Sequence, residues 1–381
     1  MVLPVREFSA AGYRSLQRIH YPMSRLDVFV GANGVGKSNL YRGLELLRAA
    51  AANTLGAELA RESLNLAMWA GPNKGGGPRQ IRLSAGFSEP NRLETAHRYE
   101  VEVGYPAPGA PVLGFEPQIK TESLTYLSGS RRVRLMDRKG PSVMVRDSEG
   151  RAVELDVDLL ASETALSQVQ DPSRYPALDL VRRTLLEWRF YHDLRTDPDA
   201  PMRKPCTAVA APTLTSDGSN LAAVFGTLAS IRQDTVDLDR MIDSAFPGVT
   251  LEMADAGRDL SFSLHYPDFP HRQFEPSELS DGTLRFLGLA GALMAYRLPP
   301  FVALNEPESS LHPDLMEPLA EMIVNAAQRT QLWLVTHSER LAKAIEDTGE
   351  GAVRTVVKRN GATTIEGLTL LGTFREEDEE D

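Results

Sequence analysis

The feature that most constrains the fold is a glycine-rich segment at residues 31–38, which reads Gly-Ala-Asn-Gly-Val-Gly-Lys-Ser. A short β-prone run at 26–30 precedes it, and apolar residues at helical spacing follow from Lys37 to Ala52. A strand, a G-x-x-x-x-G-K-[ST] loop and a helix in this order predict a phosphate-binding loop, because the N–H groups of the loop and the helix N-terminus attract phosphate oxygens. The motif predicts that Lys37 reaches the β- and γ-phosphates of a nucleotide and that the Ser38 hydroxyl binds Mg²⁺.

A second motif, Ser280-Asp281-Gly282, stands directly before a helical pattern over residues 284–296. A helix that begins here presents the Ser280 hydroxyl and unpaired N–H groups, which are the groups that a second phosphate-binding surface needs. Ser-Asp-Gly is also an ordinary sequence for capping a helix, so this segment taken alone allows both interpretations.

Two apolar runs, residues 301–304 and 332–335, predict buried strands of a covered, mostly parallel sheet. The first ends in Asn305 and Glu306, and the second is followed by His337. Open α/β sheets place their chemistry at the carboxyl ends of strands, so Glu306 is a candidate to orient or deprotonate an attacking water and His337 to bind a γ-phosphate. An acidic loop and a structural histidine are the alternatives, but the fixed order of all four motifs favours catalysis.

Composition excludes several classes of protein. The 381 residues are 42% hydrophobic, enough for a sizeable core. Cys206 is the single cysteine, so no disulfide framework or paired-cysteine metal site can form, and we expect a small buried or half-buried residue in a reducing cytoplasm. No apolar run approaches the ~20 residues that cross a bilayer, so no membrane partner is expected. The net charge of −11 argues against holding nucleic acid by bulk charge, although a local basic patch is compatible with it.

We expect a single discontinuous α/β head. Its parts, in chain order, are residues 1–70 as the core-lobe part with the glycine-rich loop, 80–158 as an antiparallel β subdomain with one solvated face, 159–275 as a mainly helical insertion, 276–372 as the part with the last three motifs, and 373–381 as an acidic disordered tail. Shorter patterns predict a flexible loop at 71–80, a buried strand at 188–191 and a helix start at 216–220.

Together these motifs resemble the ABC-type ATPases of the RecF/SMC branch. The segment at 31–38 resembles their Walker A loop, and the signature is resembled by residues 279–285, Leu-Ser-Asp-Gly-Thr-Leu-Arg. Their Walker B strand and D-loop are resembled by residues 303–313, Ala-Leu-Asn-Glu-Pro-Glu-Ser-Ser-Leu-His-Pro. Their switch histidine is resembled by residues 335–338, Val-Thr-His-Ser. Gly-Tyr-Arg-Ser-Leu at 12–16 resembles the Arg-Ser turn of this branch, and Asp-Gly-Ser-Asn-Leu at 217–221 resembles a segment of RecF-like ATPases. The rest of the region between residues 80 and 275 matches loosely.

The resemblance implies a P-loop NTPase head of the ABC type, with a mixed or parallel core sheet, an antiparallel β subdomain and an inserted helical lobe. It implies ATP and Mg²⁺ as cofactors and an ATP-dependent homodimer in which two heads sandwich two ATP molecules. By position in the motifs, the resemblance implies that ATP is contacted by Arg14, Ser15, Asn33, Gly34, Val35, Gly36, Lys37, Ser38 and Asn39. It assigns catalysis to Lys37, Glu306 and His337, and Mg²⁺ binding to Ser38 directly and to Asn305 through the outer shell. The signature that acts in trans is Ser280, Asp281 and Gly282, and the D-loop is Ser309, Ser310, Leu311 and His312.

Several departures from this family pattern matter. Asn305 stands where the family has an aspartate, and the loss of that negative charge predicts slower hydrolysis or weaker Mg²⁺ binding. Gln80, Gln118 and Gln168 are all candidates for the glutamine of the family's glutamine loop, and the sequence does not distinguish them. No coiled-coil arm or Cys-x-x-Cys hook is present, and the short stretch after His337 leaves little room for the nuclease domain of OLD-family relatives.

Three functions fit an ATPase of this kind. The first is a switch that clamps DNA, with residues 131–134 and Arg138-Lys139 as a phosphate-contacting hairpin, although a run of this kind is more often a solvated charged hairpin. The second is a signalling ATPase that contacts protein and controls a separate effector nuclease or toxin in phage defence. A transporter's nucleotide-binding domain is disfavoured, because the signature lacks Gly-Gly-Gln and lies too far from the Walker A loop.

Overall fold

The computed structural model describes residues 2–72, 79–90, 92, 94–106, 114–155, 158–192, 194–231 and 235–375. The chain divides into two compact units. Unit 1 comprises residues 1–24, 31–188 and 354–381, and unit 2 comprises residues 25–30 and 189–353. The expected loop at 71–80 and acidic tail at 373–381 lie largely outside the described residues.

Unit 1 is built on an eight-stranded antiparallel sheet. Its strands, in spatial order, are β2 (Leu16–Pro22), β1 (Val5–Tyr13), β4 (Gln80–Phe87), β5 (His97–Gly104), β6 (Gln118–Ser128), β7 (Arg131–Lys139), β8 (Ser142–Arg146) and β9 (Ala152–Glu154). The antiparallel β subdomain predicted at 80–158 is therefore larger than expected, because β1 pairs with β4. The expected solvated face is clearest in β8, where buried and exposed residues alternate, whereas β4 and β5 are buried along most of their length.

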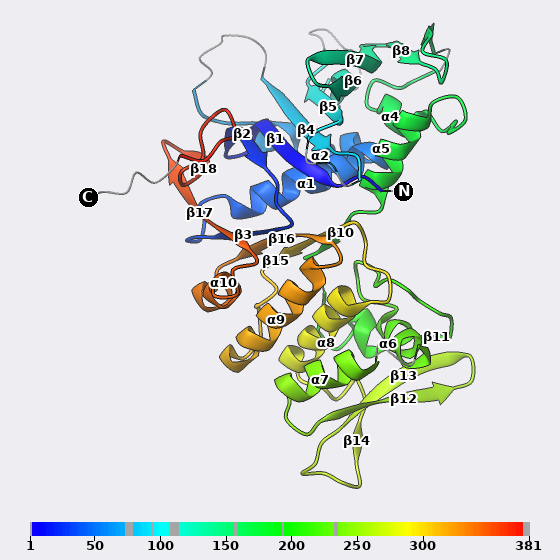
Figure 1. The fold of residues 1–381 in the computed structure, drawn as a ribbon, viewed down its shortest axis with the longest axis vertical. Helices are drawn as coiled ribbons and strands as arrows, with labels where there is room; N and C mark the ends of the chain where they lie inside the picture. Colours follow the sequence, from blue (N-terminus) through cyan, green and yellow to red (C-terminus); the bar gives the residue numbers. More distant parts are fainter. Residues whose placement is uncertain are drawn as a thin grey trace. The chain divides into compact units, whose positions relative to one another are not determined.

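The described part of unit 1 also contains five helices and a hairpin. They are α1 (Lys37–Ala51), α2 (Leu55–Arg61), α3 (Leu64–Ala67), α4 (Ala165–Gln168), α5 (Pro176–Leu186) and the antiparallel strands β17 (Ala352–Arg359) and β18 (Ala362–Ile365). Helix α1 contacts β1, β4 and α5, and Figure 1 shows it running beside β1 and β4. The leucines that predicted this helix, Leu40, Leu44 and Leu47, are all fully buried.

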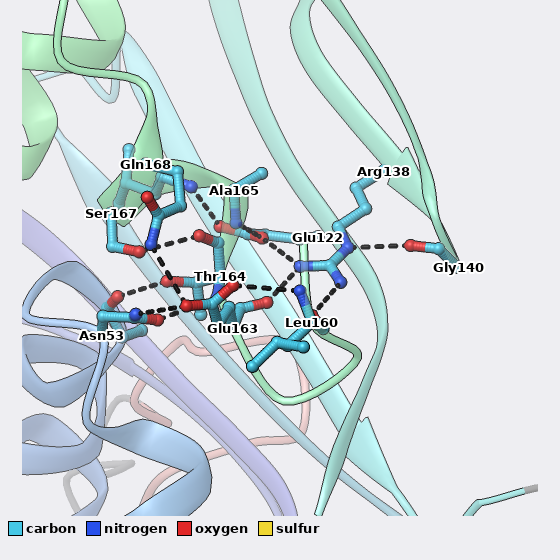
Figure 2. A network of polar contacts seen from close by, with 12 residues as sticks. Asn53, Glu122, Arg138, Gly140, Leu160, Glu163, Thr164, Ala165, Ser167 and Gln168 are labelled. Atoms are coloured by element: carbon cyan, nitrogen blue, oxygen red, sulfur yellow. Dashed lines mark hydrogen bonds and ion pairs between the residues drawn. The ribbon is translucent and has the colours of Figure 1, made fainter. Parts of the chain in front are cut away.

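A buried ion pair between β6 and β7 also holds the segment before α5 through hydrogen bonds (Figure 2). Arg138 Nη1 and Glu122 Oε2 lie 3.8 Å apart, and the two side chains are 1% and 0% exposed. The Glu122 carboxylate also accepts hydrogen bonds from the N–H groups of Ala165 (2.6 Å) and Leu166 (2.9 Å) and from the Tyr99 hydroxyl (2.9 Å). Burial raises the pKa of Glu122, and these donors oppose that rise.

This arrangement corrects one expectation about the basic hairpin. Arg138 faces the interior, where its guanidinium donates to the carbonyls of Gly140, Leu160 and Glu163, so it does not contact phosphates. The same segment reaches the far end of α1, because the Thr164 hydroxyl donates to the carbonyl of Ala50 at 2.6 Å. The helix that begins at the glycine-rich loop is therefore fixed at its other end.

Unit 2 has a parallel sheet at its centre. The strands, in spatial order, are β10 (Arg189–Tyr191), β15 (Phe301–Asn305), β16 (Gln331–Thr336) and β3 (Leu26–Val30). The apolar runs at 301–304 and 332–335 are confirmed as strands of this sheet, and the short strand expected at 188–191 is confirmed as β10, which begins at Arg189. Helices α8 (Asp281–Met294), α9 (Met316–Ala327) and α10 (Glu339–Glu346) pack in the same hydrophobic core. The carboxyl ends of β15 and β16 consequently lie side by side.

The remainder of unit 2 mixes helices and strands. It contains η1 (Pro201–Arg203), β11 (Cys206–Thr207), α6 (Leu221–Ser230), α7 (Thr235–Ala245), β12 (Thr250–Ala256), β13 (Asp259–His265), β14 (Gln273–Phe274) and η2 (Pro313–Leu315). The expected mainly helical stretch 159–275 thus includes a second antiparallel sheet, and it is divided between the two units after residue 188. Cys206 is half-buried on β11, within the expected range. In the described part of the chain, no helix is long and apolar enough to span a bilayer.

Candidate active site

The glycine-rich loop of unit 1 leads into α1 through a left-handed residue. Gly36 caps the helix with φ 99°, a conformation that a side chain would strain. Lys37 is 3% exposed, and its Nζ donates to the carbonyls of Gly31 (2.5 Å) and Ala32 (2.9 Å). Ser38 is exposed, as are residues 32–34. The loop therefore presents an accessible backbone surface with its lysine folded against it.

A chain of side-chain hydrogen bonds fixes this loop from outside. Asn39 Nδ2 donates to Ser15 Oγ at 2.6 Å, Ser15 Oγ lies 2.6 Å from Thr363 Oγ1, and Thr363 Oγ1 donates to the Val35 carbonyl at 2.7 Å. A methyl group on Gly36 would overlap both hydroxyl oxygens. Thr363 lies on β18, far along the chain from the loop, and no sequence motif marks it.

The predicted Arg-Ser turn lies beside the same loop. Arg14 has a positive φ of 45°, and its guanidinium contacts Glu62 Oε2 at 2.9 Å and Asn39 Oδ1 at 3.4 Å. Although burial acts in the opposite direction, the hydrogen bond from Arg42 and the charge of Arg14 lower the pKa of Glu62. The charged carboxylate therefore holds Arg14, whose side chain remains 40% exposed, at the margin of the loop.

Glu306 follows the last residue of β15 in unit 2, and it is strained. Its φ is 50°, which is uncommon for a residue with a side chain and is typical of functional sites. Its N–H donates to the Val335 carbonyl at 2.8 Å, and its Oε1 lies 2.6 Å from His337 Nε2. Both side chains are about one-third exposed, at 33% and 34%. The parallel pairing of β15 with β16 thus brings the two predicted catalytic side chains into direct contact.

Glu308 organises the segment around His337, a role that sequence reasoning missed. Its Oε1 accepts hydrogen bonds from Thr336 Oγ1 (2.6 Å), the His337 N–H (2.7 Å) and the Ser338 N–H (3.1 Å). A carboxylate two residues after the predicted base was the only available signal. Glu308 therefore fixes the backbone that carries the histidine.

Asn305 ends β15 with its side chain turned inward. Its Oδ1 is buried and has no hydrogen-bond partner among the described residues. An amide oxygen of this kind can accept from a metal-bound water, and a serine hydroxyl such as that of Ser38 can bind Mg²⁺ directly. Each residue type is thus one that an Mg²⁺ site uses, and the assignment of these two positions to Mg²⁺ stays a prediction.

The Ser280-Asp281-Gly282 segment forms the N-terminus of α8. Ser280 is the N-cap and its Oγ accepts from the Thr283 N–H at 3.1 Å, so the capping interpretation is confirmed. Ser280 and Asp281 are nonetheless exposed. The Ser310 carbonyl approaches so closely that a methyl group on Gly282 would lie 2.8 Å from it. This position requires glycine and places the predicted D-loop against the helix start.

The other D-loop residues lie at the surface of unit 2. Ser309, Ser310 and His312 are exposed, and Leu311 is half-buried. Ser310 has a positive φ of 66°, and His312 Nδ1 lies 3.2 Å from the Asp314 carboxylate. The segment is therefore accessible and holds a turn conformation that is rare outside glycine.

Comparison with known proteins supports the same fold. Residues 173–342 match the family described as "AAA domain, putative AbiEii toxin, Type IV TA system". An SMC head bound to the C-winged helix domain of ScpA is 14% identical, with a TM-score of 0.55 over 97% of this chain and 99% of that chain. The Smc head from Pyrococcus furiosus, bound to the C-terminal domain of ScpA, is 12% identical, with a TM-score of 0.54 over 97% of both chains. The Smc head from Pyrococcus yayanosii is 12% identical, with a TM-score of 0.50 over 97% of this chain and 98% of that chain. No curated protein matches the sequence.

The chain has the fold of an SMC head domain, the fold that its resemblance to ABC-type ATPases of the SMC/RecF branch implies. The predicted fold class is thereby confirmed, and at identities this low the solved structures carry the fold alone. The three candidate glutamines lie at the ends of elements: Gln80 begins β4, with its carbonyl close to Gly12, Gln118 begins β6, and Gln168 ends α4 beside Glu163.

Proposed function

We propose that this head binds ATP with Mg²⁺ and hydrolyses it. The contact of 2.6 Å between Glu306 and His337 is the observation that carries the proposal, because it joins an acid and an imidazole at a strained strand end. The exposed glycine-rich loop supports the nucleotide assignment. Mg²⁺, when bound, would neutralise charge on the β- and γ-phosphates.

In this proposal the chain's own groups divide the reaction between them. Loop N–H groups and Lys37 hold the phosphates, and Ser38 with Asn305 fits the Mg²⁺ shell. Glu306 orients a water and takes its proton as the water oxygen bonds to the γ-phosphorus and the bond to the β–γ bridging oxygen breaks. His337 positions Glu306 and contacts the γ-phosphate.

Hydrolysis and binding are tested together with two variants. We expect Glu306→Gln to lower the ATPase rate at least about 100-fold, the usual scale for a general base, while ATP still binds. Lys37→Ala should weaken ATP binding itself. A Glu306→Gln protein that hydrolyses ATP at the wild-type rate would refute the assignment of the base.

We further propose that ATP closes a dimer of two heads. Ser280 and Gly282 stand exposed or half-exposed at a helix N-terminus, which is a surface suited to the γ-phosphate bound by another copy. Ser309, Ser310 and His312 are exposed on the same unit and would cross the interface. Each phosphate loop is then half of a site that a second chain completes.

A basic groove on unit 1 favours DNA as the ligand of the closed dimer. The groove has a volume of about 440 Å³ between β5, β6 and β7. Its lining includes four cations, two acids and hydroxyl groups from β6; the charged residues are Arg98, Arg132, Arg134, Lys139, Glu100 and Asp137. The ion pairs of Arg134 with Asp137 and of Arg98 with Glu7 reduce its positive potential. We therefore expect weak, salt-sensitive contacts with the phosphate backbone.

The DNA proposal is tested by DNA retention at low and raised salt, with and without ATP. Arg132→Glu should weaken retention, whereas Arg240→Glu, the same charge change at an exposed arginine of unit 2, should leave it nearly unchanged. Absence of any ATP-dependent retention would favour the alternative, a head that controls a separate effector protein. Two of the similar Smc heads are themselves bound to domains of a protein, ScpA.

A further inference from the structure

A short 3-10 helix, η1, is seated against the helix that carries the signature. Met202 in η1 is 2% exposed, and its Sδ lies so close to α8 that a methyl group on Gly288 would be 2.8 Å away. Gly218 contacts the same methionine. This packing fixes the backbone of η1 and therefore the origin of its last side chain, Arg203.

The guanidinium of Arg203 binds the turn that precedes α8. Its Nη1 donates to the carbonyls of Pro276 (2.9 Å), Ser277 (3.2 Å) and Leu279 (2.9 Å). Its Nε donates to the Thr196 carbonyl at 2.8 Å, which anchors the other edge of the group. One planar cation with donors on several edges thus holds three carbonyls of the turn.

Arg203 also contacts the first residue of α8. Its Nη2 lies 2.9 Å from Asp281 Oδ1, and the two side chains are 9% and 62% exposed. A carboxylate at this position stabilises a helix N-terminus but repels a phosphate that approaches the same N–H groups. A guanidinium beside it offsets that repulsion.

We propose that Arg203 is a positioning residue for the signature. It holds the turn so that Ser280 and Gly282 face outward with their donors in place, and it neutralises Asp281, so that the γ-phosphate of ATP bound to a second copy can dock. This inference rests on the proposed ATP-dependent dimer. Nothing in the sequence motifs identifies Arg203.

The test measures ATP-dependent association of the Glu306→Gln protein and compares it with the same protein carrying changes at these positions. We expect Arg203→Ala to weaken association at least tenfold, while ATP affinity of the separate heads stays within about twofold, because the phosphate loop belongs to unit 1. Asp281→Asn alone removes the repulsive carboxylate and should associate more tightly. The double variant Arg203→Ala/Asp281→Asn should associate at least threefold more tightly than Arg203→Ala alone. A purely structural role of Arg203 would not give this rescue.

Arg203→Lys keeps the inference testable if the alanine variant fails to fold. Lysine retains the charge but cannot hold three carbonyls and a carboxylate together, so association should fall at least threefold while circular dichroism shows that the fold is retained. Tight association of the alanine or the lysine variant would overturn the role of Arg203 and leave the dimer standing. If the parent Glu306→Gln protein does not associate with ATP, the proposed dimer fails, and the inference falls with it.

Discussion

Thr363→Val removes one hydroxyl from the wall of the phosphate loop and keeps the shape of the side chain. Thr363 is 2% exposed, and its Oγ1 donates a hydrogen bond to the Val35 carbonyl at 2.7 Å. The same oxygen lies 2.6 Å from Ser15 Oγ, so the substitution also interrupts the connection to Asn39. The loop loses its anchor, and ATP must then order it on binding.

The size of the effect follows from the burial of these groups. Leaving a buried polar group without its partner costs about 1–3 kcal/mol. Since 1.4 kcal/mol corresponds to tenfold in an equilibrium constant, we expect ATP affinity to fall by about 5-fold to about 140-fold if the full penalty falls on the loop. Thr363→Ser retains the hydroxyl and should bind ATP nearly as wild type does.

The assay is titration calorimetry with a non-hydrolysable ATP analogue. Thr364→Val is the matched control, because it makes the same chemical change on the next residue, whose hydroxyl donates within the hairpin to the Val357 carbonyl at 3.4 Å. It should leave affinity unchanged. A Thr363→Val protein that binds the analogue as tightly as wild type would refute the reasoning that β18 holds the loop.

Three further predictions concern other positions. Gly36→Ala places a methyl group against the hydroxyls of Ser15 and Thr363 at φ 99°, so ATP binding should fall below detection in the same titration while the fold, followed by circular dichroism, persists. Asn305→Asp restores a negative charge beside the proposed Mg²⁺ shell, so ATPase rates should saturate at several-fold lower Mg²⁺; identical Mg²⁺ curves would contradict this. Glu122→Gln leaves the buried Arg138 charge unpaired, so the free energy of unfolding should fall by about 3 kcal/mol or more and the melting temperature by roughly 6 °C or more. Glu100→Gln makes the same change at a 40% exposed side chain and should alter the melting temperature little.

The sequence predicts the parts of this head that depend on local pattern. The glycine-rich loop and α1 follow from the loop motif and the spacing of Leu40, Leu44 and Leu47. The strands at 301–305 and 331–336 follow from short apolar runs. Because such strands pair in parallel, the polar residues at their carboxyl ends, Glu306 and His337, could be expected close together.

Contacts between distant parts of the chain could not be predicted in this way. Thr363 reaches Val35 across 328 positions, and Arg203 reaches Leu279 across 76, so no spacing in the sequence relates the partners. Arg138 lies in a run of basic residues and differs from its neighbours only because its strand face is buried against Glu122. Side-chain direction in a twisted sheet with register shifts decides this, and the shift between Leu124 and Thr125 is not visible in the sequence.

The mass of the Glu306→Gln protein in solution, measured with and without ATP, tests the central claim most directly. The chain has a mass of 41.9 kDa, and it should sediment as a monomer without nucleotide and at twice that mass with ATP and Mg²⁺. Adding Lys37→Ala to the same protein should abolish the shift, because the loop then no longer holds the phosphates. A Glu306→Gln protein that binds ATP and remains at 41.9 kDa would contradict the claim that each phosphate loop is half of a shared site.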